Sequence, residues 1–178
     1  MYVYRNRLVF IAHPRTASRS VAKALPGAVL WGTHHEVNVV KAQNILDNGG
    51  TVVSTVRNMY DVLVSWFHRA HRSDPPTNFV QVEKFSNWLD KVLEGGHQYL
   101  DQDPYHFGYD ASNFVIPYEQ IDDMFGELCR LEDIDVAKLP NIGASIRYRD
   151  YRRYYTDTTR QMVEDRWGRE QEQLGYSF

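Results

Sequence analysis

Two uninterrupted runs of apolar and β-branched residues constrain the fold of this chain more than any other feature. Residues 8–12 (LVFIA) are apolar throughout, and residues 51–56 (TVVSTV) are strongly β-branched. Continuous runs of this kind are typical of strands buried on both faces of a parallel sheet, because a half-exposed strand alternates apolar and polar residues. The two runs therefore predict a sheet that is covered on both sides.

Segments with helical spacing follow most of the predicted strands. The expected strands are residues 8–12, 28–31, 51–56 and 114–116, and the expected helices are residues 18–25, 39–46, 61–72, 82–93, 121–131 and 158–173. Strands and helices alternate in units short enough for parallel βαβ crossovers. This order predicts a single α/β domain over residues 1 to 178, interrupted at residues 73 to 110.

Composition excludes several classes of function. The chain has 178 residues, 43% of them apolar, and a formal net charge of −3, which argues against a general nucleic-acid binder with a basic face. No stretch reaches the ~18 apolar residues of a membrane span, and residues 8–12 are shorter than the core of a signal peptide. Cys129 is the single cysteine, so no intrachain disulfide or cysteine-rich zinc site is possible. We expect a cytoplasmic protein.

A polar turn, HPRTAS at residues 13–18, leads from the first strand into a helix. Ligands of open parallel sheets bind beyond the carboxyl ends of the strands, where helix N-termini attract anions. Arg15 and the hydroxyls of Thr16, Ser18 and Ser20 suit a phosphate cradle; alternatively, Ser18 caps the helix and the arginines are solvated. The turn lacks glycine and a Gly-Lys-Ser/Thr ending, which disfavours a kinase that uses ATP or GTP.

Arg57 ends the strand at residues 51–56, and Ser65 lies on the helix that follows. A charge at the end of a buried strand is costly without a partner. A strand-end arginine often pairs with a carboxylate, however, and a serine within a helix is commonly just tolerated. Neither residue alone indicates a site.

Together these segments resemble the sulfotransferases that use 3′-phosphoadenosine 5′-phosphosulfate (PAPS). That family has a Pro-Lys-Thr/Ser-Gly-like turn and an Arg-x-x-x-Asp-Val-x-x-Ser-Trp-type motif after a strand. The similar segments are HPRTAS at residues 13–18, RNMYDVLVSWFH at 57–68, VIPYE at 115–119, and the C-terminal helix and tail from Tyr154 to Phe178. They occur in order along nearly the whole chain, residues 73 to 110 excepted, as in short, soluble bacterial or phage-type members.

The resemblance implies a P-loop-NTPase-like three-layer α/β fold, with a central, mainly parallel sheet flanked by helices. It also implies that the first loop binds the 5′-phosphosulfate through Arg15, Thr16, Ala17, Ser18, Arg19 and Ser20. Arg57 and Ser65 match the pair that binds the 3′-phosphate, and an arginine with a hydroxyl suits a dianion. Tyr118 falls where the family places a residue near the adenine, and Arg147 lies in a basic stretch that would close over the nucleotide.

This chain departs from the family pattern at two positions of the first loop. Arg15 stands where the family usually has lysine, and Ala17 stands where it has glycine. Arginine keeps the charge and can bridge two oxygens, so we expect donor binding to persist. The same departures leave open a non-catalytic nucleotide-binding domain of this fold.

A loop after the second predicted strand holds His34, His35 and Glu36. Several branches of the family have a catalytic histidine in such a loop, and a histidine suits general-base work near neutral pH. We expect His34 to take the acceptor proton, with His35 or Glu36 as alternatives, while Arg15 stabilises the departing phosphate. The expected reaction transfers a sulfuryl group to a carbohydrate, phenol or tyrosine hydroxyl without a metal. Residues 73 to 110 are the expected acceptor-side insertion.

Overall fold

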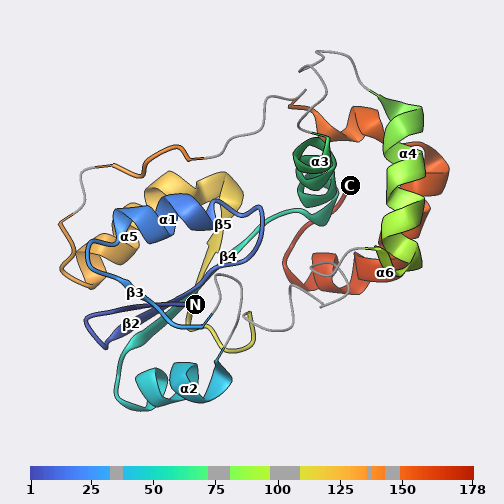
Figure 1. The fold of residues 1–178 in the computed structure, drawn as a ribbon. Helices are drawn as coiled ribbons and strands as arrows, with labels where there is room; N and C mark the ends of the chain where they lie inside the picture. The colour runs from blue at the N-terminus through green and yellow to red at the C-terminus, as the bar shows by residue number, and fades with distance from the viewer. Residues whose placement is uncertain (33–37, 72–80, 97–108, 136–137, 143–148) are drawn as a thin grey trace. The chain divides into compact units, whose positions relative to one another are not determined.

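The computed structural model of this chain describes residues 1–32, 38–71, 81–96, 109–135, 138–142 and 149–178 (Figure 1). The chain divides into two compact units. The sheet unit comprises Met1–Arg57 with Asp103–Gly143, and the helical unit comprises Asn58–Gln102 with Ala144–Phe178. The single domain over residues 1 to 178, with its insertion at residues 73 to 110, stays a prediction.

The sheet unit is built on five strands in the order β3-β1-β2-β4-β5. They are β1 (Tyr2–Tyr4), β2 (Leu8–Ile11), β3 (Val29–Leu30), β4 (Thr51–Val56) and β5 (Phe114–Pro117). Strands β2, β4 and β5 are parallel, and β1 pairs antiparallel with both β2 and β3. The expected α/β class is confirmed, and the centre of the sheet is parallel as predicted.

Strand β1 was not expected from the sequence, because a run of three residues is too short to give a clear period. Tyr4 pairs with Leu8, and between them Arg5 and Asn6 have φ angles of 50° and 53°. Positive φ at both central positions is typical of tight hairpin turns. This hairpin puts β1 between β2 and β3. Strand β3 therefore pairs antiparallel with β1, and the parallel crossover expected at β3 is wrong.

Each face of the sheet has its own helices, because successive residues of a strand point to opposite faces. Phe10 and Val53 lie in one core with residues of two helices, whereas Val9 and Val52 lie in a second core with residues of a third. The three helices are α1 (Ser18–Ala24) and α5 (Ile121–Leu131) on the first face and α2 (Val39–Asp47) on the other (Figure 1). Burial on both faces explains the continuous apolar sequences of β2 and β4.

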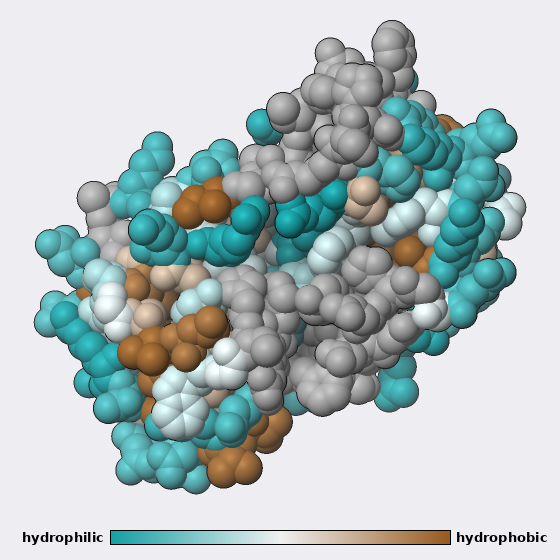
Figure 2. All heavy atoms as spheres, in the orientation of Figure 1, coloured by the Kyte–Doolittle hydropathy of each residue, from teal (hydrophilic) through white to brown (hydrophobic). Residues whose placement is uncertain are grey.

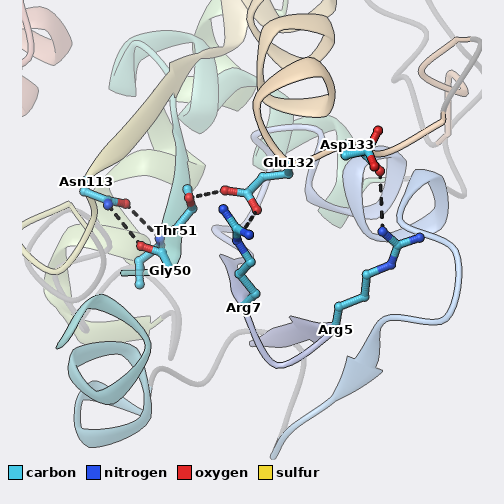
Figure 3. Close-up of polar contacts among 8 residues, drawn as sticks. Arg5, Arg7, Gly50, Thr51, Asn113, Glu132 and Asp133 are labelled. Carbon is cyan, nitrogen blue, oxygen red and sulfur yellow. Dashed lines mark hydrogen bonds and ion pairs between the residues drawn. The ribbon is translucent and has the colours of Figure 1, made fainter. Parts of the chain in front are cut away.

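Polar contacts fix the amino ends of the parallel strands (Figure 3). The Glu132 side chain is 7% exposed, its Oε1 accepts a hydrogen bond from the Thr51 hydroxyl, and its Oε2 lies 3.3 Å from Nε of Arg7. The contact with Arg7 joins two opposite charges, so a carboxylate buried at this position is neutralised within the chain.

Asn113 continues the pairing of β5 with β4 through its side chain (Figure 3). Its Oδ1 accepts from the Val52 amide at 2.8 Å, and its Nδ2 donates to the Gly50 carbonyl at 3.3 Å. A Cβ on Gly50 would lie 2.3 Å from the Arg7 carbonyl oxygen, so only glycine fits there. We call Arg7, Gly50, Thr51, Asn113 and Glu132 the amino edge. Its contacts are internal to the sheet unit.

The helical unit has an aromatic core. Its elements are α3 (Met59–Ala70), α4 (Val82–Lys91), η1 (Val92–Gly96), η3 (Tyr151–Tyr154) and α6 (Asp157–Gln173). The Phe67 ring lies 5.5 Å from the Phe85 ring, and Phe85 lies 5.9 Å from Tyr154. Thr156 caps α6 by accepting from the Thr159 amide. The predicted helices at residues 61–72, 82–93 and 158–173 are present.

The beginning of α3 is attached to α6 and to the C-terminal tail. The Met59 amide donates to Gln171 at 2.9 Å, and the Asn58 side chain donates to the Ser177 carbonyl at 2.9 Å. The Tyr60 hydroxyl donates to Glu164 at 2.6 Å; burial, and then this carboxylate, raise the pKa of Tyr60. The second and fourth segments of the sulfotransferase resemblance are thus in contact within this unit.

Exposed apolar side chains of the sheet unit gather near β3 and the start of α2. Among the described residues they include Val29, Leu30, Trp31, Val39 and Val40, and Figure 2 shows brown atoms over this region. The ammonium of Lys41 on α2 lies 4.7 Å from the Trp31 ring, which joins the two segments. Across the described ranges, no helix has both the length and the apolar character needed to cross a membrane.

Candidate functional site at the carboxyl edge of the sheet

The loops that follow β2, β4 and β5 begin at one edge of the sheet, because the three strands are parallel. Ile11 pairs with Ser54, and Val56 pairs with Pro117, so the residues after each strand are neighbours in register. The residues that follow are the loop from His13 to Ala17, then Arg57, then Tyr118. This is the edge where ligands of open parallel sheets bind.

The loop after β2 has a backbone that most side chains avoid. Arg15 and Ala17, on either side of Thr16, have φ angles of 64° and 60°. Left-handed residues in a turn direct successive backbone N–H groups into a concavity that suits an anion. A left-handed position also explains why the family that this chain resembles has glycine at the place of Ala17.

Ala17 is also the N-cap of α1, and no side chain makes a cap hydrogen bond there. The alternative interpretation, in which Ser18 caps the helix, is therefore wrong. Ser18 is instead buried in the first turn, at 5% exposure, and the next residue, Arg19, is exposed.

The Thr16 side chain holds the loop against β4. Its hydroxyl donates to the His13 carbonyl at 2.9 Å and lies 2.6 Å from the Thr55 hydroxyl. A hydroxyl has one hydrogen, so Thr55 is the donor in the second bond. Thr16 is 4% exposed. Its hydroxyl hydrogen is directed to the loop's own backbone, and any role in phosphate binding stays a prediction.

Ser20 has an internal contact as well. Its hydroxyl oxygen accepts a hydrogen bond from the Ile142 amide at 3.1 Å, and the side chain is 4% exposed. The predicted loop residues therefore differ in position: Thr16, Ser18 and Ser20 are buried, Arg15 and Ala17 are half-buried, and Arg19 is exposed. Their binding roles stay predictions.

Arg57 is the buried cation of this edge, at 6% exposure. Its Nη1 donates to the Arg15 carbonyl at 2.8 Å, and its Cζ lies 3.7 Å from the centre of the Tyr118 ring. The first contact joins the two segments that the sulfotransferase resemblance pairs. The second contact is with Tyr118, which the resemblance places near the adenine. We call Arg15, Thr16, Ala17, Arg57 and Tyr118 the carboxyl edge.

Ser65 is buried on α3 at 2% exposure and belongs to the helical unit, whereas Arg57 belongs to the sheet unit. Their joint binding of one phosphate stays a prediction. His34, His35, Glu36 and Arg147 lie outside the described residues. The choice of base and the closing of the basic stretch over a nucleotide stay predictions too.

Thr55 was not identified from the sequence, although one signal could have found it. Alternation along β4 puts Thr55 on the same face as Val53, and that face carries the helix that follows the loop. A hydroxyl at the carboxyl end of a buried strand, on that face, is a natural partner for the loop.

In the described part of the chain, no group of three or more His, Cys, Asp or Glu side chains is arranged to hold a metal ion. Comparisons with protein-family models, with curated proteins and with solved structures found no match for this chain.

Proposed function

We propose that this chain is a PAPS-dependent sulfotransferase on a P-loop-like three-layer fold. The observation that carries the proposal is the hydrogen bond of 2.8 Å from the Arg57 guanidinium to the Arg15 carbonyl. It joins, within one unit, the strand-end arginine of one motif to the loop of the other. A buried guanidinium beside a loop with left-handed residues suits a ligand that carries more than one phosphate.

The donor set at the carboxyl edge fits such a ligand. Arg57 supplies a planar, permanently charged fork for the 3′-phosphate, together with Ser65 of α3 in the proposed complex. Arg15 and the backbone N–H groups of residues 15–19 hold the 5′ end in the proposed complex. The Thr16 hydroxyl donates its hydrogen to the His13 carbonyl. We therefore assign the contact with phosphate to the backbone N–H groups of this loop.

Bound PAPS supplies an activated sulfuryl group to an acceptor hydroxyl. In the proposed reaction, His34 takes the hydroxyl proton as the acceptor oxygen bonds to sulfur, with His35 or Glu36 as alternative bases. Arg15 and the loop N–H groups stabilise the negative charge on the 5′-phosphate oxygen as its bond to sulfur breaks. Most of the rate gain then comes from alignment and charge stabilisation, by analogy with phosphoryl transfer.

Calorimetric titration with adenosine 3′,5′-bisphosphate (PAP), beside ADP and 5′-AMP, tests the proposal. We expect binding that depends on the 3′-phosphate, so that PAP binds at least about tenfold more tightly than either control. Equal binding of all three nucleotides, or no binding, would exclude a PAPS enzyme.

Turnover with PAPS over a panel of carbohydrates, phenols and tyrosine peptides then separates an enzyme from a binding domain. We expect release of PAP that depends on one class of acceptor. PAP binding without turnover over the whole panel would favour the non-catalytic nucleotide-binding domain that the Arg15 and Ala17 departures suggest.

A further inference from the structure

The aromatic ring of Tyr118 lies against the guanidinium of Arg57. The distance from Cζ to the ring centre is 3.7 Å, at which a guanidinium and a ring are in van der Waals contact. Both residues directly follow paired strand ends, since Val56 pairs with Pro117 in the parallel ladder. The register of β4 with β5 therefore makes Arg57 and Tyr118 neighbours.

This contact engages one face of the Tyr118 ring. A base that stacks on a ring needs a free face, and the face toward Arg57 is taken by the guanidinium. The family that this chain resembles places a residue near the adenine at this position. Here the ring packs on the arginine that is proposed to bind the 3′-phosphate.

Arg57 in turn acts on the first loop. Its Nη1 donates to the Arg15 carbonyl at 2.8 Å, and Arg15 has a left-handed φ of 64°. The carbonyl of Arg15 and the N–H of Thr16 belong to one planar trans peptide, so they point in opposite directions. Fixing the carbonyl toward Arg57 therefore fixes the Thr16 N–H away from it.

We infer that Tyr118 is a positioning residue for the two phosphate subsites and does not contact the adenine. Its ring holds the Arg57 guanidinium in one orientation, and Arg57 holds the Arg15–Thr16 peptide. Tyr118 thereby sets the preference of the site for a ligand with a 3′-phosphate. The part of this inference that concerns nucleotides rests on the proposed function; the part that concerns the loop does not.

Two substitutions distinguish the role of the Tyr118 ring from that of its hydroxyl. Tyr118→Leu removes the aromatic face, whereas Tyr118→Phe keeps it and loses only the hydroxyl. Each variant is titrated with PAP and with 5′-AMP. The dissociation constant of 5′-AMP divided by that of PAP measures the preference for the 3′-phosphate. We expect Tyr118→Leu to lower this ratio by about tenfold, chiefly by weakening PAP, and Tyr118→Phe to retain most of it.

An adenine contact predicts a different result. If the Tyr118 ring stacked on the base, Tyr118→Leu would weaken PAP and 5′-AMP by the same factor, and the ratio would not change. That outcome would overturn the inference while leaving the sulfotransferase proposal intact. A wild-type ratio near one would instead contradict the proposed function.

Amide hydrogen exchange without nucleotide tests the loop directly. We expect the amides of His13, Arg15, Thr16 and Ala17 to exchange at least about tenfold faster in Tyr118→Leu than in the wild type, and Tyr118→Phe to behave as the wild type. Amides of α2, on the other face of the sheet, serve as the internal control for general loosening. Unchanged exchange at residues 13–17 in a folded Tyr118→Leu protein would overturn the inference, whatever the protein binds.

Discussion

The two edges of the parallel sheet differ in the charged group that each of them buries. At the amino edge the buried Glu132 carboxylate meets the Arg7 cation, and the Asn113 side chain bonds two backbone groups. At the carboxyl edge the Arg57 guanidinium donates to the Arg15 carbonyl and packs on the Tyr118 ring. The amino edge thus buries a carboxylate, and the carboxyl edge buries a guanidinium.

Left-handed residues other than glycine lie beside both edges. Each such residue costs roughly 1–2 kcal/mol. Arg5, Asn6 and Asp133 lie beside the amino edge, and Arg15 and Ala17 lie in the loop after β2. Strain of this kind persists where the surrounding contacts hold it, so it does not by itself distinguish the two edges. We therefore expect the amino edge to contribute to stability and, under the proposed function, the carboxyl edge to bind the nucleotide.

The largest expected effect is the difference in PAP affinity between variants of the two arginines, Arg57 at the carboxyl edge and Arg7 at the amino edge. Arg57→Ala is expected to weaken PAP binding by at least about a hundredfold, because losing one partner of a buried, charged hydrogen bond typically costs 2–5 kcal/mol. Arg7→Ala, the matched change at the amino edge, is expected to leave the affinity within about twofold. Calorimetric titration of both variants measures the difference.

Thermal unfolding of the same two variants shows that each is folded at the temperature of the titration. Arg57→Lys adds a further control, since lysine keeps the charge without the planar fork and should give an intermediate affinity. Equal losses of PAP affinity in Arg57→Ala and Arg7→Ala would remove the functional distinction between the edges.

The second prediction concerns stability at the amino edge. Glu132→Ala leaves the Thr51 hydroxyl and Arg7 without this carboxylate and is expected to lower the free energy of unfolding by about 2 kcal/mol. Glu132→Gln keeps an acceptor for Thr51 and should cost less than about 1 kcal/mol, because the Arg7 side chain is 66% exposed and its ion pair is screened. Urea unfolding measures both. A Gln variant as unstable as the Ala variant would show that the ion pair dominates.

Much of the fold could be predicted because burial on both faces leaves a direct mark on the sequence. Strand β4 and helix α5 begin and end at the predicted residues, since the apolar run of one and the periodicity of the other are uninterrupted. Strand β1 could not be predicted, because its place depends on the turn at Arg5 and Asn6 rather than on its own three residues. The antiparallel pairing of β3 follows from β1 and was missed with it.

The candidate site could be predicted in part, because residues directly after buried strands must meet at one sheet edge. That rule finds Arg57 and the loop at residues 13–17 from the sequence. It does not find the contact between Arg57 and Tyr118, which depends on the register of Val56 with Pro117. A register is a relation between distant segments, and nothing in either segment alone encodes it.

The third prediction sharpens the role of the Thr16 contact with β4. Thr55→Val keeps the shape of the side chain but removes the hydrogen bond to Thr16, and we expect it to lower the free energy of unfolding by about 1 kcal/mol. Thr55→Ser keeps the hydroxyl and should lose less. Chemical denaturation measures both variants. If Thr55→Val were as stable as the wild type, the loop would be held by its other contacts alone.

The smallest effect tests the strain itself with a pair of opposite substitutions. Ala17→Gly relieves a left-handed position at the carboxyl edge, where φ is 60°. Glycine also gains freedom in the unfolded chain, so the expected net gain in the free energy of unfolding is only about 0.5 kcal/mol. Gly49→Ala makes the reverse change at φ 72°, where a Cβ would meet no atom within 4 Å, and should lose about 1 kcal/mol.

Denaturant unfolding of both variants at one temperature measures these two differences. Opposite signs are expected because the substitutions alter backbone preference in opposite directions and alter little else. A loss of stability in Ala17→Gly would mean that the alanine methyl makes contacts worth more than the strain it causes. The left-handed conformation at Ala17 would then be a by-product of packing.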